Sequence, residues 1–281
     1  MEQGEIRKAV RNGYGKIAKN SGSCCLPGAS CGCGGNSVEK LSQGIGYSPE
    51  EIQAVPEGAN LGLGCGNPLA LASIREGETV LDLGSGAGFD AFLAARSVGK
   101  TGRVIGVDMT PEMLDKAREN ARKGRYENVE FRLGEIENLP AADHTVDIII
   151  SNCVINLSPD KERVFREAFR VLKPGGRLVV SDIVLLNRLP DALIESIEAY
   201  VGCVAGAVMK EDYLRAIGEA GFKNIDIVGE AVFPAEEYLG LSAVQEYADH
   251  LKLPREKVAE IGTSIASIKV RAVKPAANQG Q

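Results

Sequence analysis

The sequence predicts an α/β fold with a doubly wound parallel sheet, and two observations lead to that prediction. Short apolar runs rich in Val, Ile and Leu recur along the chain, and segments with helical patterning separate them. The first run, in residues 80–90, leads into a turn with glycine at positions 84, 86 and 88. Because glycine tolerates positive φ and has no Cβ, such a turn lets the backbone approach a ligand at the next helix N-terminus.

The predicted elements alternate in chain order. Strands are expected at residues 80–83, 103–109, 129–135, 146–152 and 177–180, with a Pro-Gly-Gly turn before the last of them. Helices are expected at roughly residues 89–97, 111–123, 160–172 and 189–200. Two more strands are predicted at residues 223–229 and 264–273, with a helical insertion between them. Alternation of this kind is typical of a parallel sheet with helices on both faces.

An extension of helices and a cysteine-rich loop is predicted before the sheet. Residues 4–20 are interpreted as a short charged helix, and residues 21–36 as a loop of Gly, Ser and Cys. Ser48 and Pro49 are typical of a helix start, because serine caps free N–H groups and proline suits the first turn. A short helix at about residues 67–74 then leads into the sheet.

Length and composition fit one substantial core with appendages. The 281 residues are 44% hydrophobic and 25% charged, which is ordinary for a globular protein. We expect three parts: an N-terminal helical and Cys-rich extension at 1–66, a ligand-binding domain at 67–230, and a C-terminal helical insertion, final strand and tail at 231–281.

Charge and cysteine content argue against several classes of partner. The net charge of −6 disfavours a broad electrostatic grip on nucleic acid. The basic residues of 118–125 are interpreted as a solvated helix face, with a local basic patch as the alternative. No apolar signal core or membrane-spanning run is present, so we expect a cytoplasmic protein with no membrane association. Seven cysteines, an odd number in a reducing compartment, do not predict a disulfide framework.

Acidic residues at two predicted strand ends favour a nucleoside ligand. Asp82 lies just before the glycine turn, and Asp108 follows the second strand, 24 residues beyond Gly84. This is about the spacing at which a carboxylate binds ribose hydroxyls in dinucleotide-binding folds. A nicotinamide-dependent dehydrogenase is the competing interpretation. It is disfavoured because those enzymes usually have Gly-x-Gly-x-x-Gly nearer the N-terminus, whereas this turn has Gly-x-Gly-x-Gly.

Two turns, Asp-Leu-Gly-Ser-Gly-Ala-Gly at 82–88 and Leu-Lys-Pro-Gly-Gly at 172–176, resemble those of the S-adenosylmethionine-dependent methyltransferases. The resemblance implies a Rossmann-like doubly wound sheet and S-adenosylmethionine as the cofactor. The expected cofactor contacts are Asp82, Gly84, Ser85 and Gly86 for the methionine end, Asp108 for the ribose, Met109, Glu135 and Ile136 for the adenine, and Asn152 for the methionyl portion. For Glu135, a surface acid at a strand end is an equally good interpretation.

Three cysteines are expected near the open end of this sheet. Cys153 follows the fourth strand directly, Cys203 follows the fifth strand and its helix, and Cys65 lies in a Gly-Cys-Gly loop expected to be mobile. Ligands of open α/β sheets bind outside the carboxyl ends of the strands, so all three could converge over the cofactor. A single cysteine beside a strand is more often a small buried hydrophobe. Three soft thiols together would suit a thiophilic acceptor, and their spacing excludes a compact zinc ribbon.

The sequence around these cysteines resembles the arsenite S-adenosylmethionine methyltransferases in three places: residues 64–68, 148–161 and 202–207. The resemblance implies that Cys65, Cys153 and Cys203 bind trivalent arsenic, supplied as arsenite or an arsenic–thiol conjugate, for methylation and detoxification. It also implies thioredoxin or glutathione as the reductant. An N-terminal cysteine takes part in the redox step in some relatives. Here Cys24, Cys25, Cys31 and Cys33 compete for that role, and a structural or adventitious metal loop is the alternative.

Two other functions stay open at this point. The chain could methylate another small molecule, such as a quinone or sterol-like acceptor, with the cysteines only packing. It could also be a non-catalytic arsenic- or metal-binding protein on the same fold. An arsenic lone pair carries no proton at the attacking atom, so arsenic methylation needs no general base. The two histidines, His144 and His250, lie outside any catalytic motif, which agrees with this chemistry.

Overall fold

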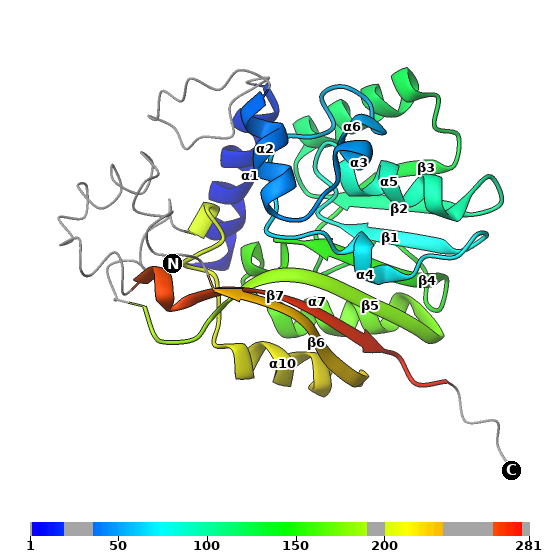
Figure 1. Ribbon diagram of the computed structural model, residues 1–281. Coiled ribbons are helices and arrows are strands. Elements are labelled where there is room, and N and C mark those ends of the chain that lie inside the picture. Colours follow the sequence, from blue (N-terminus) through cyan, green and yellow to red (C-terminus); the bar gives the residue numbers. More distant parts are fainter. Residues whose placement is uncertain (1, 20–35, 190–199, 233–260, 277–281) are drawn as a thin grey trace, which may run out of the picture.

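A seven-stranded sheet in the order β3-β2-β1-β4-β5-β7-β6 forms the centre of the molecule (Figure 1). The computed structural model describes residues 2–19, 36–189, 200–232 and 261–276. The strands are β1 (Thr79–Leu83), β2 (Arg103–Asp108), β3 (Val129–Leu133), β4 (Val146–Asn152), β5 (Leu172–Leu185), β6 (Lys223–Val232) and β7 (Ile265–Val273). All seven predicted strands are present, and the largest difference is in β5, which extends five residues beyond its expected bounds at each end.

Helices cover both faces of the sheet. They are α1 (Gln3–Lys19), α2 (Asn36–Gly44), α3 (Pro49–Gln53), α4 (Leu69–Ala72), α5 (Phe89–Val98), α6 (Pro111–Gly124), α7 (Lys161–Val171) and α10 (Lys210–Glu219), with the 3₁₀ turn η1 (Ile155–Leu157). Adjacent residues of one strand point to opposite faces. Val80 and Ile148 pack with α5 and α6, whereas Leu81 and Ile149 pack with α7 and α10. The central strands are therefore apolar on both sides, as a covered parallel sheet requires.

The sheet is mixed rather than wholly parallel. The first five strands pair in parallel, as predicted. β7 runs antiparallel to both β5 and β6 and lies between them. The reason is topological: β6 is placed one strand away from β5, and the chain fills the gap on its return. The Pro-Gly-Gly segment does not precede β5 but lies inside it, where the pairing register with β4 shifts.

Several local predictions can be compared with the structure. The capping box at Ser48 is present, with Ser48 Oγ accepting from Glu51 N and Glu51 returning a bond to Ser48 N. The helix expected at 67–74 shortens to α4 because Ser73 adopts a left-handed φ of 46°. The helix α10 was not predicted. The Gly/Ser/Cys loop with its four cysteines, most of the helix expected at 189–200 and the helical insertion lie outside the described residues.

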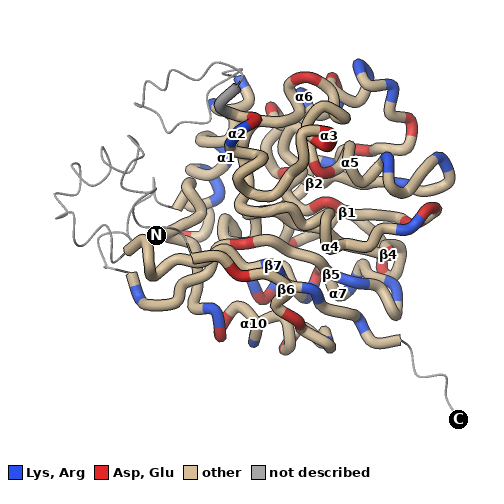
Figure 2. The backbone as a smooth tube through the Cα atoms, viewed as in Figure 1, with Lys and Arg blue, Asp and Glu red and all other residues tan. Residues whose placement is uncertain are grey.

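Figure 2 shows Lys and Arg (blue) interspersed with Asp and Glu (red) along the backbone. On α6, Arg118 pairs with Asp115 at 3.7 Å and Lys123 pairs with Glu119 at 2.8 Å. The basic residues of this helix therefore belong to an exposed face with its own acidic partners.

Within the described residues, no helix is long and apolar enough to cross a membrane.

Candidate functional site

The glycine turn after β1 has a backbone that only glycine fits well. Gly84 and Gly88 have φ values of 67° and 96°. A Cβ on Gly84 would lie 2.2 Å from the Val154 side chain, and one on Gly88 would lie 2.6 Å from Phe92. The turn therefore brings its backbone close to the segment after β4, and α5 begins directly behind it at Phe89. Its N-terminal N–H groups are directed toward the same side as the turn.

Asp108 ends β2 and is bound to this turn. Its Oδ2 accepts a hydrogen bond from Gly86 N at 3.0 Å, and its Oδ1 accepts from Thr110 N at 2.8 Å. Burial raises the pKa of Asp108, whereas the backbone N–H bonds lower it. Each carboxylate oxygen keeps a further lone pair for a ligand hydroxyl. The structure thus places Asp108 at the strand end where the sequence predicted a ribose contact.

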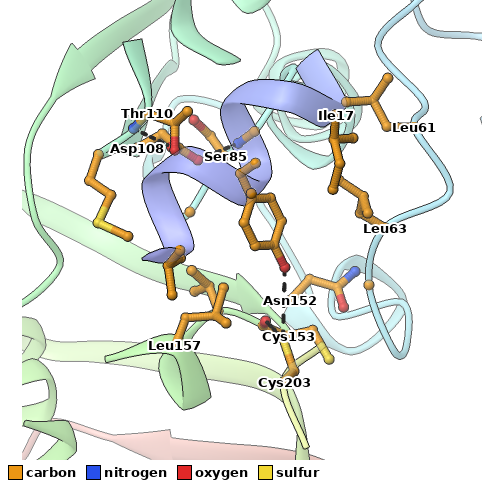
Figure 3. A pocket seen from close by; sticks show the side chains of 18 of the residues that line it. Ile17, Leu61, Leu63, Ser85, Asp108, Thr110, Asn152, Cys153, Leu157 and Cys203 are labelled. Carbon is orange, nitrogen blue, oxygen red and sulfur yellow. Dashed lines mark hydrogen bonds between the residues drawn. The ribbon is translucent and has the colours of Figure 1, made fainter. Parts of the chain in front are cut away.

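A cavity of about 810 Å³ opens at the carboxyl ends of the strands, a size that suits a nucleoside-containing ligand. α1 forms one wall with Val10, Tyr14 and Ile17. Figure 3 shows Asp108 with Ser85 and Thr110 in one part of this cavity and Asn152, Cys153 and Cys203 in another. The predicted site residues that line it are Cys65, Asp82, Gly84, Ser85, Gly86, Asp108, Met109, Ile136, Asn152, Cys153 and Cys203.

Glu135 is the predicted site residue that does not line the cavity. Its carboxylate pairs with Arg7 and Arg11 of α1, each at 3.6 Å. This geometry favours the second interpretation of Glu135, an acid at a strand end, and gives it a partner on the N-terminal helix. The neighbouring Glu137 does line the cavity and was not predicted. Glu137 accepts bonds from Ser158 Oγ at 2.7 Å and Arg7 Nη2 at 3.2 Å.

Asp82 presents an unpartnered buried oxygen in the cavity wall. The residue is 3% exposed, and its Oδ2 has no hydrogen-bond partner among the described residues. Burial raises the pKa of Asp82, and the nearby charges of Asp90 and Asp108 raise it further. A buried carboxylate oxygen without a donor is costly. The site therefore fits a ligand with a cationic or N–H group at this point, such as the amino group of a methionine moiety.

Three free thiols meet at the other part of the cavity. Cys203 Sγ donates to the Cys153 carbonyl at 3.1 Å. Hydrogen bonding with the Cys203 and Cys65 thiols, together with burial, raises the pKa of Cys153 well above its ordinary value. Cys153 and Cys203 have φ values of 58° and 64°. A left-handed backbone is strained for cysteine and is not required by a merely space-filling side chain. Convergence and strain together favour a ligand site over simple packing.

Comparison with known proteins decides the family. The methyltransferase domain model matches residues 74–221. Curated arsenite methyltransferases of Halobacterium salinarum and Aquipseudomonas alcaligenes are 50% and 40% identical to the chain over 229 and 230 residues, in each case 79% of the chain. An arsenic (III) S-adenosylmethionine methyltransferase structure from Chlamydomonas reinhardtii is 35% identical with a TM-score of 0.63, covering 87% of this chain and 75% of that one. The chain belongs to the arsenite methyltransferase family.

This arsenite methyltransferase family member spans 59% and 64% of the length of those two curated relatives.

Asn152 organises the thiol side of this family member's site. Its Oδ1 accepts from Cys65 N at 3.0 Å, and its Nδ2 lies 2.7 Å from Gly66 O and 2.9 Å from Tyr47 Oη. Ser267 Oγ also donates to Cys65 O at 2.8 Å. The loop that the glycines suggested to be mobile is thus held on both sides of Cys65.

Two further charged groups lie behind the thiols and were missed in the sequence. Asp182 is fully buried, and burial raises its pKa to about 6. Lys161 donates to Ser158 O at 3.0 Å, and burial lowers its pKa to about 8. The sequence did contain one sign of Asp182, because it is a charged residue inside the apolar run of β5. It follows Ser181, which pairs with Asn152 at the end of β4.

Proposed function

We propose that the protein transfers a methyl group from S-adenosylmethionine to trivalent arsenic bound by Cys65, Cys153 and Cys203. One observation carries the proposal: three free thiols from distant segments converge on the cavity that also contains Asp82 and Asp108. The identity of 50% to the Halobacterium salinarum arsenite methyltransferase supports the same substrate.

The cofactor side of the cavity has residues that suit S-adenosylmethionine, which supplies an electrophilic methyl group on a sulfonium when bound. Asp82 Oδ2 would accept from the amino group of the methionine moiety. Asp108 would accept from the ribose hydroxyls with the lone pairs left by Gly86 and Thr110. Met109 and Ile136 offer apolar contact for the adenine.

The thiol side would exchange oxygen for sulfur on arsenic. As(OH)₃ reacts with three thiols to give As(SR)₃ and three molecules of water, so each thiol proton leaves with a departing hydroxide. The product is neutral, which suits a buried site because no net charge is transferred from water. As(SR)₃ keeps a lone pair directed away from its three sulfurs. That lone pair attacks the methyl carbon, so no proton has to be removed from the acceptor, and no histidine is found among the described lining residues.

Positioning and exclusion of water would supply much of the catalysis. α1 covers the cavity with Val10, Tyr14 and Ile17, and Arg7 bonds Glu137 across it at 3.2 Å. Holding two reactants in line can lower a barrier by roughly 7–11 kcal/mol when the alignment is good. The N-terminal helix is therefore assigned to enclosing the reactants.

Repeated methylation requires electrons that the site itself does not renew. Methyl transfer converts As(III) to As(V), and return to As(III) takes two electrons, which two thiols supply when they form a disulfide. Thioredoxin or glutathione would then reduce that disulfide, which places the protein in a reducing compartment such as the cytoplasm. Cys24, Cys25, Cys31 and Cys33 lie outside the described residues, and no individual role is assigned to them.

The test is product analysis. Full-length protein with arsenite, a thiol and S-adenosylmethionine labelled on its methyl should give labelled methylarsenic species. Cys153→Ser should give none, whereas Ser97→Ala should match the parent, because Ser97 Oγ bonds only within α5 to Leu93 O. Label found on a quinone or sterol-like acceptor instead would contradict the proposal. Tight arsenite binding without any methylated product would favour a binding protein.

A further inference from the structure

Asp182 is a fully buried carboxylate behind the thiols. It is 0% exposed. Its Oδ1 accepts from Asn156 Nδ2 and from Ile183 N, both at 2.9 Å, and its Oδ2 accepts from Tyr213 Oη at 3.1 Å. The positive charge of the buried Lys161 ammonium also acts on this carboxylate and lowers its pKa, against the larger effect of burial, which raises it. Its three hydrogen bonds come from neutral donors and occupy three of its four lone-pair directions.

This carboxylate lies close to two of the three thiols. One Asp182 carboxylate oxygen, Cys65 Sγ and Cys153 Sγ all lie within 4.8 Å of one another. Cys203 is not part of that group, because its thiol is directed to the Cys153 carbonyl. Two overlapping ligand sets therefore share Cys65 and Cys153. One is completed by the sulfur of Cys203, and the other by the oxygen of Asp182.

We propose that Cys65, Cys153 and Asp182 bind a thiophilic divalent cation of the Cd²⁺ or Zn²⁺ class, in competition with trivalent arsenic. Tetrahedral Zn²⁺ has bonds of about 2.3 Å to sulfur and about 2.0 Å to carboxylate oxygen. These bonds correspond to ligand atoms about 3.5–3.8 Å apart. The three atoms lie within 4.8 Å of one another, so binding a cation must bring them closer together by side-chain movement. A water takes the fourth position.

The two ligand sets differ in what Asp182 contributes. Binding of the cation, M²⁺, by two thiols and one carboxylate releases two protons and leaves a net charge of −1. Two thiolates already balance the charge of the cation, so the site keeps the single negative charge that Asp182 carries without it, and the carboxylate contributes a third bond. As(III) binds three sulfurs in a neutral pyramid and has no coordination position for the carboxylate. Asp182 thus distinguishes a soft divalent cation from arsenic, and the cation blocks arsenic by occupying Cys65 and Cys153. The competition rests on the proposed function, whereas cation binding itself does not.

The test uses the full chain with Cys24, Cys25, Cys31 and Cys33 replaced by serine, so that their thiols do not bind the probe. Titration with Cd²⁺ alone, followed by sulfur-to-cadmium ultraviolet absorption and calorimetry, should show one cation per chain. In that background Asp182→Asn, which preserves size, should weaken Cd²⁺ binding at least tenfold and change arsenite affinity less than twofold. The matched variant Cys203→Ser should show the reverse pattern.

Several outcomes would overturn the site. If Asp182→Asn binds Cd²⁺ as tightly as its parent, the carboxylate is not a ligand. If it loses Cd²⁺ and arsenite affinity equally, Asp182 only supports the fold. X-ray absorption of the Cd²⁺-loaded parent needs no variant and should show two sulfurs with oxygen; three or four sulfurs without oxygen would contradict the proposal. A protein that binds Cd²⁺ in this way but methylates no arsenic would refute the proposed function and leave the cation site standing.

Discussion

The side chain of Asn152 accepts a hydrogen bond from the backbone N–H of Cys65 at 3.0 Å, across 87 positions of sequence. This bond fixes the loop before the sheet to the end of β4, one residue before Cys153. The spacing between two of the proposed arsenic ligands is therefore set by a residue that needs no contact with arsenic.

Replacing Asn152 with alanine should release Cys65. The Cys65 N–H and the Gly66 carbonyl would lose their partners, and each unsatisfied buried group costs about 1–3 kcal/mol. We expect arsenite affinity to fall roughly tenfold or more, the equivalent of about 1.4 kcal/mol, and alkylation of Cys65 by iodoacetamide to accelerate. Mass spectrometry of the modified peptide measures that rate. Asn128→Ala is the control, because Asn128 Nδ2 bonds Ala95 O and Gly99 O far from the thiols. An unchanged Cys65 rate in Asn152→Ala would remove the positioning role.

Asp108→Ala should weaken binding of S-adenosylmethionine. Hydrogen bonds to a charged acceptor are worth about 1.5–3 kcal/mol, so the dissociation constant should rise by one to two orders of magnitude. Asp108→Asn should lose less, because an amide oxygen still accepts from Gly86 N or Thr110 N and keeps the turn. Calorimetric titration of both variants gives the comparison. Equal affinity in Asp108→Ala and the parent would show that this carboxylate does not contact the cofactor.

Two glycine substitutions separate backbone strain from steric conflict. Gly84 and Gly175 both have positive φ, 67° and 79°, but a Cβ at Gly175 meets no described atom within 4 Å, whereas one at Gly84 lies 2.2 Å from Val154. Gly175→Ala should cost about 1 kcal/mol from the backbone alone. Gly84→Ala should cost more in thermal unfolding and should also lose cofactor affinity. Adding Val154→Ala should restore part of the stability; if it restores none, the clash is not the cause.

The buried ammonium of Lys161 predicts a pH effect on stability. Its folded pKa of about 8 lies below the unfolded value near 10.4, so between these pH values the unfolded chain binds more protons. The free energy of unfolding therefore rises with pH over this window, by up to about 3 kcal/mol from this group. Lys161→Met has no ammonium group, so its free energy of unfolding should lack this pH-dependent contribution. Urea unfolding at pH 7.5 and 10.5 should show the parent gaining stability relative to Lys161→Met. A difference between the two proteins that does not change with pH would contradict the shift.

The sheet and the glycine turn could be predicted because their causes are local. Apolar residues on both sides of a strand, as at Val80 and Leu81, mark a covered sheet, and the turn at Gly84 needs glycine for its own backbone. α10 was missed because its preceding residue, Met209, provides no side-chain cap and a glycine interrupts its last turn. The antiparallel β7 depends on strand order, which no local pattern encodes.

The site was predictable where strand ends determine it, as for Asp108 and Cys153. It was not predictable where a partner lies far along the chain. Asn152 lines the cavity, and its hydrogen bonds link it to Tyr47, Gly66, Cys65 and Asp90, all of which precede it by at least 62 residues. Asp182 becomes a candidate ligand only because the fold brings it close to the thiols of Cys153 and Cys65, which lie 29 and 117 positions away in the sequence.

Serine variants of the three cysteines should distinguish two arsenic substrates by the number of oxygens that thiols can replace. Arsenite has three exchangeable oxygens and needs three thiols, whereas methylarsenite has two and needs two. Each of Cys65→Ser, Cys153→Ser and Cys203→Ser should therefore bind arsenite weakly, because a hydroxyl is a hard and poorly ionised donor. Cys65 should matter as much as the others, since Asn152 and Ser267 hold its loop and no mobile neighbour replaces it. Methylarsenite should still be methylated by at least one variant that keeps an adjacent pair. The measurement is the rate of product formation from each substrate, and wild-type rates with arsenite in Cys153→Ser and Cys203→Ser would show that these cysteines only pack.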